Sequence, residues 1–447
     1  MAIPVISSNR ASAANAKLYM AFESVRGTAP ENAGVGSENY VGIRRDDATL
    51  GVTESLDTDP DLQGGRTPAA PLLNTRDGQW SLSVGVDKRI IGYHVGALLG
   101  PATVTDAKSW GFLMFKKNPS DTNTIELNGV TWTFVAASPT GNETLIGADL
   151  AATLTQLAID LNASADTDID DATYTASGWR LLIEADATGS AGDAYTLAAD
   201  GVADVSAATL SGGGLKRHVF ASGAANLPSF TLATEHTDLA SGLGRFPALA
   251  GCWTNDMAVT VAPNGRAVAR FSGGAVNERQ LDAALVGGVA LDPAYERCSN
   301  LQGGLLLADQ CVAGTVESGT INYSNNFSAD RTVRCPGDPD AGTVDEAIPG
   351  QASGGFQAQS RFYSPALHDL GTVSTLLRET KKVYWQFYDP ADGMAVRFTL
   401  GQVTIPGAVR TYGAGSPTIT VPINGQASGG TLDMLSVEIL NDITEYS

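Results

Sequence analysis

Aspartates at alternate positions are the first residues of this sequence that could perform chemistry. The segment DTDIDD, residues 166–171, places aspartates where an EF-hand loop holds its first three calcium ligands. Such a loop also needs glycine at its sixth position and glutamate at its twelfth, and these positions hold Asp171 and Ser177. The segment DTDPD, residues 57–61, fails in the same way, with Pro68 at its twelfth position. We therefore predict solvated acidic loops and no metal site.

Cysteine and histidine residues are few and scattered. No two cysteines stand in C-x-x-C spacing, so we expect buried free thiols rather than a zinc site or a disulfide framework. No histidine lies in a recognisable catalytic triad context, and no G-x-x-x-x-G-K-[ST], G-x-G-x-x-G or H-E-x-x-H motif occurs. We predict no catalytic residue, no cofactor and no enzyme activity. The residues concerned are Cys252, Cys298, Cys311, Cys335, His94, His218, His236 and His368.

The charge of the chain is acidic and unevenly distributed. The formal net charge is −20, which argues against tight binding of nucleic acid, because such binding depends on Lys and Arg, although transient contact with DNA stays open. Residues 121–214 hold fourteen acidic side chains against Arg180 alone, a net charge of −13. No signal peptide pattern and no apolar run approaching roughly 20 residues occurs, so we predict a soluble protein made in a cytoplasm and no membrane insertion.

Elements of the β type must position these side chains. A chain of 447 residues predicts two or three domains, and its glycine-rich, alternating sequence favours strands over helices. The segment DGQWSLSVGV alternates apolar with polar residues, which predicts a half-buried strand at 79–86. A strand at 48–56 precedes it across a Pro-, Gly- and Asp-rich loop, residues 57–78, and a short helix at 89–99 follows it.

The same order of elements recurs later in the chain. A strand at 311–324, a long loop at 331–354, the strand GGFQAQSRFY and a helix at 365–378 repeat the first series, which indicates a duplicated module. Each series ends in hairpins, and the last strand is predicted at 416–427. Both long loops carry arginines beside aspartates, a mixture suited to self-association.

A small acidic domain interrupts the first module. A hairpin about Asn128 and Gly129, an amphipathic helix with Leu154, Leu157 and Leu161 on one face, and a second hairpin predict an α+β fold. We expect Trp132 and Trp179 in its core, because both lie in alternating strands. The predicted divisions are 1–120 and 215–310 for the first module, 121–214 for the insert, and 311–447 for the second module.

The sequence resembles the tail tube proteins of long-tailed bacteriophages. The opening MAFESVRGTAP, the series TESLDTDPDLQGGRT and DGQWSLSVGVDKRIIGYHVGALLG, and the closing TITVPINGQA are similar to that family. The segment QASGGFQAQSRFYSPALHDL resembles the second core of members that hold two modules in one chain. The insert is similar to small domains that decorate the exterior of phage structural proteins.

This resemblance implies a mainly β fold with duplicated tail-tube β-sandwich or barrel modules, short flanking helices and the inserted α+β domain. It implies a virion tail protein, assembled in the bacterial host cytoplasm, whose stacked rings conduct DNA to the host. Two modules in a chain imply trimeric, pseudo-hexameric rings, with true hexamers as the alternative. The implied partners are further copies of the chain and the tape measure, tail terminator and distal tail proteins.

The resemblance also divides the candidate residues between bore and ring contacts. With Trp80 and Leu82 packed on the helix of the module, Gln79, Ser81 and Ser83 are left to face the lumen. The two long loops are expected to bridge successive rings. The candidates for ring stacking are Asp59, Asp61, Arg66, Arg76, Arg331, Arg334, Asp338 and Asp340.

Two other functions stay open at this point. One is a phage or bacterial surface β-sandwich protein that contacts glycan or cell wall through the insert, which would require exposed aromatic side chains. The other is a tail-associated polysaccharide depolymerase, which would require long stacked repeats or paired carboxylates, and neither pattern is evident.

Overall fold

The fold was analysed in a computed structural model of the whole chain. The structure describes residues 16–30, 40–57, 71–236, 246–262, 265–281, 297–299, 303–307, 310–311, 316–331, 342–361, 381–389, 392–405 and 420–446. Within these ranges the protein is mainly β, as predicted, with few and short helices. None of the helices in these ranges has the length and apolar character needed to cross a membrane.

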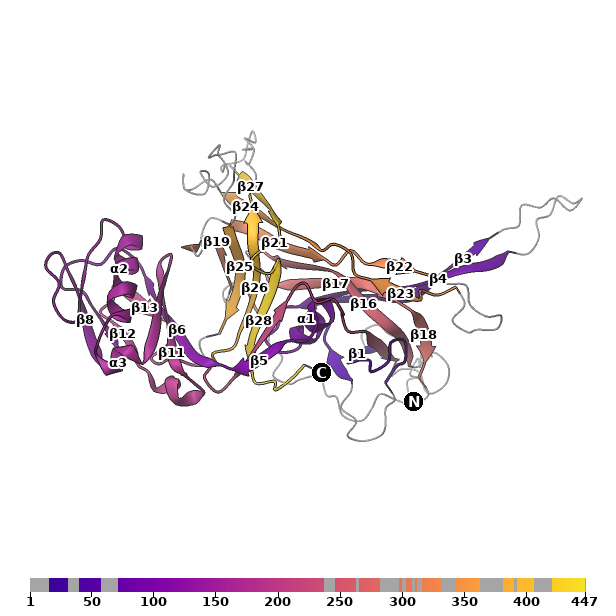
Figure 1. Ribbon diagram of the computed structural model, residues 1–447, viewed down its shortest axis with the longest axis horizontal. Coiled ribbons are helices and arrows are strands. Elements are labelled where there is room, and N and C mark those ends of the chain that lie inside the picture. Colours follow the sequence, from indigo (N-terminus) through magenta and orange to yellow (C-terminus); the bar gives the residue numbers. More distant parts are fainter. Residues whose placement is uncertain are drawn as a thin grey trace, which may run out of the picture.

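A large antiparallel sheet, called the central sheet here, runs through both halves of the chain (Figure 1). Its strands pair through backbone hydrogen bonds between neighbours in the order β3, β4, β17, β16, β21, β24, β27. Their bounds are β3 Asp47–Asp57, β4 Leu72–Gly85, β17 Val268–Ala275, β16 Pro247–Val261, β21 Val316–Ser324, β24 Ser353–Arg361 and β27 Thr420–Ala427.

A second sheet and a helix share one hydrophobic core with the central sheet. The helix is α1, Ile91–Leu99, close to the helix predicted at 89–99. The second sheet has the order β19, β25, β26, β28, β14, β5, and the short β20 pairs with β19. Its bounds are β19 Gly303–Leu307, β20 Gln310–Cys311, β25 Lys381–Tyr388, β26 Ala395–Thr404, β28 Leu435–Asn441, β14 Lys216–Ala221 and β5 Thr103–Asp106.

The first half of β16 belongs to a further group of strands. It pairs with β15 (Phe230–His236) and β18 (Asn277–Gln280), and β15 continues to β1 (Ala16–Phe22) and β2 (Val41–Ile43). The Glu23 carboxylate holds the turn after β1, because it accepts hydrogen bonds from the backbone N–H groups of Gly27 at 2.8 Å and Gly251 at 2.7 Å. The Glu and the Gly of the segment ESVRGTAP therefore stabilise the turn that follows β1.

The strands and helices of the insert pack around a hydrophobic core of their own (Figure 1). One sheet has the order β10, β11, β6, β13 and the other β12, β7, β8, β9. The predicted hairpin about Asn128 and Gly129 is confirmed, with both residues at positive φ, and the predicted helix is α2. The bounds are β6 Lys108–Phe115, β7 Thr124–Leu127, β8 Val130–Val135, β9 Glu143–Leu145, α2 Leu150–Asn162, α3 Thr167–Asp170, β10 Ala172–Ser177, β11 Arg180–Thr188, β12 Leu197–Ala199 and β13 Ala203–Val205, with a 3-10 turn at Ser190–Ala194.

Polar contacts join the two halves of the chain near α1. The buried Lys88 ammonium lies 2.9 Å from an Asp389 carboxylate oxygen and 2.8 Å from one of Asp392, at the turn between β25 and β26. At the other end of α1, the buried Asn325 side chain donates hydrogen bonds to the carbonyls of Leu98 at 2.9 Å and Thr254 at 3.2 Å. The late strands are therefore tied to the first helix.

The barrel named among the expected folds is not seen, since no sheet closes on itself within the described part of the chain. The outer edge of β3 pairs with no other strand described, and β27 pairs beyond β24 only with the last residues of β26. A single chain therefore presents an open sheet. The helix predicted at 365–378 lies outside the described residues, and the predicted domain divisions stay predictions.

Candidate functional site

Strand β4 separates an apolar face from a polar face, as the alternation in DGQWSLSVGV predicts. Trp80, Leu82 and Val84 are buried in the core, and Trp80 is fixed there because its indole N–H donates to the carbonyls of Trp253 and Gly274 at 3.2 and 3.1 Å. On the opposite face, Gln79 and Ser81 are exposed and Ser83 is half-buried. The expected division between core and polar residues on this strand is confirmed.

The polar face of β4 continues across the whole central sheet. One row places Ser81 beside Ser272 of β17, followed by Asp256, Ser324 and Ser353 on the next three strands. The next row holds Ser83, Arg270, Ala258, Asn322 and Gly355. Side chains of neighbouring strands that stand directly opposite each other share one face of a sheet, so short polar groups cover this face almost without interruption.

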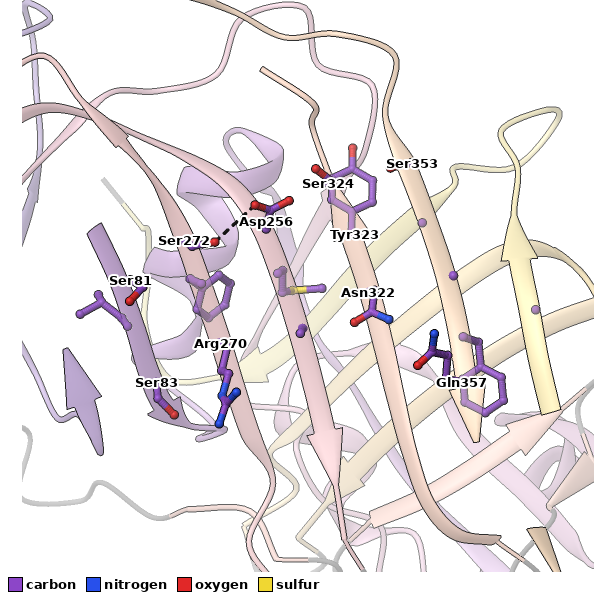
Figure 2. Close-up of a pocket in the computed structure, with 18 of the residues that line it drawn as sticks. Ser81, Ser83, Asp256, Arg270, Ser272, Asn322, Tyr323, Ser324, Ser353 and Gln357 are labelled. Carbon is purple, nitrogen blue, oxygen red and sulfur yellow. Dashed lines mark hydrogen bonds between the residues drawn. The ribbon is translucent and has the colours of Figure 1, made fainter. Parts of the chain in front are cut away.

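The rows enclose a shallow hollow of about 750 Å³ (Figure 2). Its lining takes residues from both halves of the chain and combines hydroxyl, amide and backbone groups with apolar side chains such as Met257 and Phe271. Arg270 and the carboxylates of Asp47 and Asp256 are its charged side chains, and Asp256 accepts hydrogen bonds from Ser272 at 3.3 Å and Asn255 at 2.9 Å. The described lining includes no histidine and no cysteine.

The strands of the second half carry polar residues of this face that the sequence analysis did not select. Asn322 follows Ile321 and precedes Tyr323 on β21, and Gln357 follows the buried Phe356 on β24. The signal was present as the same period-two alternation that identifies Ser81 and Ser83. What alternation could not show is that the two halves pair through β16 and β21 into one surface.

Two candidates for ring stacking lie in the described residues, and both have partners in the chain. The Arg76 guanidinium donates to a carboxylate oxygen of Glu54 at 3.0 Å, and Arg331 forms an ion pair with Asp77. Of these two pairs, only Arg331–Asp77 joins the two halves, at one end of the central sheet. Arg76 and Asp77 lie within strand β4, so the loop predicted at 57–78 is wrong for residues 72–78. The other six candidates, Asp59, Asp61, Arg66, Arg334, Asp338 and Asp340, lie outside the described residues.

The thiols and the histidine near the core have properties of structural groups. Cys252 and Cys298 are free and buried, as expected, and burial raises the pKa of Cys298 to about 12 and that of Cys252 well above its usual value. Burial also lowers the pKa of His94 to about 4, and its ring stacks on Phe271 at 5.1 Å between centroids. Cys335 and the side chain of Cys311 lie outside the described residues.

The segment DTDIDD folds as a short capped helix rather than as an EF-hand loop. Residues 167–170 form α3, and the Asp166 carboxylate accepts a hydrogen bond from the N–H of Asp168, so it caps the helix. In the described part of the chain, no three metal-binding side chains come together.

One of the two tryptophans of the insert departs from expectation. Trp132 is buried, but 61% of Trp179 is exposed, so the expectation that both lie in the core is wrong for Trp179. The reason is that Trp179 follows Gly178, at a φ of 62°, in the turn between β10 and β11 and is not part of the alternating ladder.

Comparison with known protein families matches residues 13–427 to the family described as phage tail tube protein. This match spans most of the 447 residues and includes every strand of the central sheet. A search of curated proteins found no match.

Proposed function

The chain belongs to the phage tail tube protein family, a structural component of the virion tail, and on this premise we propose that the polar face of the central sheet lines the bore of the tube. Proteins of this family self-assemble into a tube, which must present one surface to the passing DNA. The observation that carries the proposal is the row Ser81, Ser272, Asp256, Ser324 and Ser353, which places a polar side chain on each of five neighbouring strands from both halves.

The chemistry of this face suits a conduit for DNA. Proteins hold duplex DNA mainly through Lys and Arg contacts with phosphates, and each such contact would act as friction on a moving duplex. Arg270 is the one cation in the described lining, and two carboxylates accompany it. Hydroxyl and amide groups keep water at the wall without binding the phosphate backbone tightly, so DNA contact is transient.

The order of strands supports trimeric, pseudo-hexameric rings. The series β3, β4, β17, β16 is followed in the sheet by β21, β24 and β27, with the end of β26 beside β27. Each half thus supplies a strand, a long connection, a second strand and a returning hairpin in the same spatial order. Three chains would provide six such units, and continuation of the sheet from the β27 edge of one chain to the β3 edge of the next would remove the exposed edges. A ring of six chains is the alternative.

The remaining partners follow from the position of a tube in a tail. A tube needs a tape measure protein to set its length, a tail terminator at one end and distal tail proteins at the other. We propose these as partners of the assembled rings rather than of the single chain.

Electron microscopy of the assembled protein tests the proposal directly. We expect stacked rings with three-fold chain symmetry and a bore wide enough for duplex DNA, with Ser81 and Ser83 on its wall. Discrete monomers under all assembly conditions would contradict the tube, and a bore lined by the second sheet would contradict the assignment of the face.

Added cations test the same face by its chemistry. Tubes that carry Ser81→Lys and Ser83→Lys should bind a short DNA duplex at low salt, because each ring would gain lysines along its wall. The matched control is Thr105→Lys, which adds an exposed lysine on β5 of the second sheet. Equal DNA binding by both variants would contradict the assignment of the polar face to the bore.

A further inference from the structure

A lysine of the first half is enclosed between two carboxylates of the second half. Lys88 precedes α1, and its side chain is only 7% exposed. Its Nζ lies 2.8 Å from an oxygen of Asp392 and 2.9 Å from an oxygen of Asp389. An amine in contact with two carboxyl groups has the two reactants and the proton carrier that amide formation between side chains requires.

The surroundings of this cluster exclude most water. The neighbouring Cys298 is 2% exposed, and burial, assisted by the charge of Asp87, raises its pKa to about 12, so its thiol stays neutral. The fully buried Asn441 donates a hydrogen bond to the backbone carbonyl of Lys88 at 2.8 Å and fixes the backbone there. A surrounding of low polarity narrows the difference in free energy between the ion pair and a neutral amine beside a neutral acid.

The two aspartates are held differently, which divides the roles that each suits. Oδ2 of Asp392 contacts Lys88, and Oδ1 of Asp392 accepts a hydrogen bond from the backbone N–H of Met394 at 2.9 Å. An N–H group aimed at a carboxyl oxygen stabilises the negative charge that collects on it when the carboxyl carbon is attacked. Asp389 is less exposed, at 17% against 39% for Asp392, and is suited to proton transfer.

We propose that Lys88 and Asp392 condense into an intramolecular amide, with Asp389 as the proton carrier. Asp389 takes a proton from the Lys88 ammonium, and the neutral Nζ adds to the carboxyl carbon of Asp392. The new N–C bond forms as the C–Oδ2 bond breaks. Two protons of the ammonium pass through Asp389 to Oδ2, which leaves as water, and the third stays on the amide nitrogen. One ammonium and one carboxylate are thus replaced by one amide and one water, without oxidation or reduction.

The resting cluster is ionic, and this sets the pace of the reaction. Burial acts to lower the pKa of Lys88, but the hydrogen bonds with Asp392 and Asp389 outweigh it, so this pKa is raised. Attack therefore passes through the small population in which the proton has moved to Asp389. Reacting groups that a fold holds in contact behave as if present at very high concentration, which compensates for this small population. One slow turnover per chain is sufficient, because the product stays in place.

The bond would close a long loop of the single chain. It would join positions 304 residues apart, and so connect the segment before α1 to the turn between β25 and β26. A cross-link over a long loop restricts the unfolded chain more than the folded one and therefore favours the folded state. Cys252 and Cys298 are free thiols, and an amide, unlike a disulfide, is not opened by reduction. The inference concerns the folded chain alone and does not depend on the proposed tube.

Mass spectrometry of the purified full chain tests the proposal. After incubation, we expect an intact mass lower by one water than the sequence requires. We also expect a branched tryptic peptide in which residues 77–89 are joined to residues 383–397, because trypsin does not cleave after a lysine whose amine is acylated. The full sequence mass together with two separate peptides would overturn the proposal. The unmodified chain alone decides this point, so failure of a variant to fold would not affect it.

Variants separate the amide from another loss of water. Asp392 precedes Gly393, and an Asp-Gly pair also loses water when it closes to a succinimide. Lys88→Arg should abolish the branched peptide, and Asp389→Asn should slow its formation at least about tenfold. The matched control is Lys216→Arg, which changes an exposed lysine paired with Asp106 and should leave the cross-link unchanged. Loss of water that persists in Lys88→Arg, with no branched peptide in the unmodified chain, would identify a succinimide and overturn the amide.

Discussion

At the scale of residues, His94 is the titratable group whose environment most clearly affects stability. It is buried beneath the polar face, stacks on Phe271, and has no hydrogen-bond partner at Nε2 among the described residues. A charged imidazole is costly there, which is why its pKa falls to about 4 from an ordinary value near 6.5. As the pH decreases through this interval, the unfolded chain binds a proton that the folded chain does not, so protonation favours unfolding.

His94→Gln should therefore make stability less dependent on pH. The free energy of unfolding of the unmodified chain should fall by about 2.4 kcal/mol more than that of the variant between pH 7 and pH 4.5. Denaturant titrations of unassembled protein at the two pH values measure the difference, and groups common to both proteins cancel. Parallel pH profiles for the two proteins would contradict the lowered pKa of His94.

Some of the burial that the structure shows could be predicted from the residues next to each position in the sequence, and some could not. Trp80, Leu82, Ser81 and Ser83 follow from alternation on one strand, because burial of one face of a strand is encoded in its own sequence. The exposure of Trp179 could not be predicted from alternation, because Trp179 lies in a turn and not in a strand.

At the scale of elements, Asn325 connects three parts of the fold. It directly follows β21, and its side-chain amide donates to the last turn of α1 and to β16. Helix ends leave carbonyl groups without partners inside the helix, and here a residue of the second half satisfies one of them.

Asn325→Ala should destabilise the chain by about 1 to 3 kcal/mol, because it leaves buried carbonyls without their donor. The comparison is Asn424→Ala, an exposed amide on β27, which should change the free energy of unfolding by less than about 0.5 kcal/mol. Chemical denaturation measures both variants. A loss no larger than that of the control would show that the Asn325 link contributes little.

Elements closed by local turns could be predicted, and their arrangement could not. A local sequence pattern predicts each of three elements: the hairpin at Asn128 and Gly129, the helix α2 and the strand β4. The pairing of β16 with β21, and the hydrogen bond from the Arg76 N–H on β4 to the Gly342 carbonyl, join residues far apart in the chain. Such pairings depend on which edges meet in the folded molecule, and a single sequence holds no local signal for that.

At the scale of the whole molecule, the insert is attached through neighbouring strands. Asp106 at the end of β5 pairs with Lys216 at the start of β14, so the chain leaves and re-enters the body at adjacent positions. Its contact with the body includes Trp110, whose ring lies 4.0 Å from that of Tyr388 between centroids. The insert core is separate from the core of the body.

Replacement of residues 107–215 by an Asn-Gly turn should leave ring and tube assembly intact. The two strands already pair, so a two-residue hairpin turn can close them without rearrangement of the second sheet. Electron microscopy of the shortened protein beside the full chain measures the outcome, with circular dichroism to verify folding. A well-folded shortened chain that forms no rings would show that the insert takes part in assembly.

The position of the insert also governs how finished tubes behave toward one another. Its residues 121–214 carry −13 of the −20 net charge, on a domain set apart from the central sheet. If this domain lies on the outside, each tube carries a layer of negative charge on its outer surface. Electrostatic screening has a range of about 8 Å at physiological salt, so this layer keeps parallel tubes from adhering sideways in a crowded cell. The insert would then keep the filaments from aggregating, although it takes no part in forming the bore.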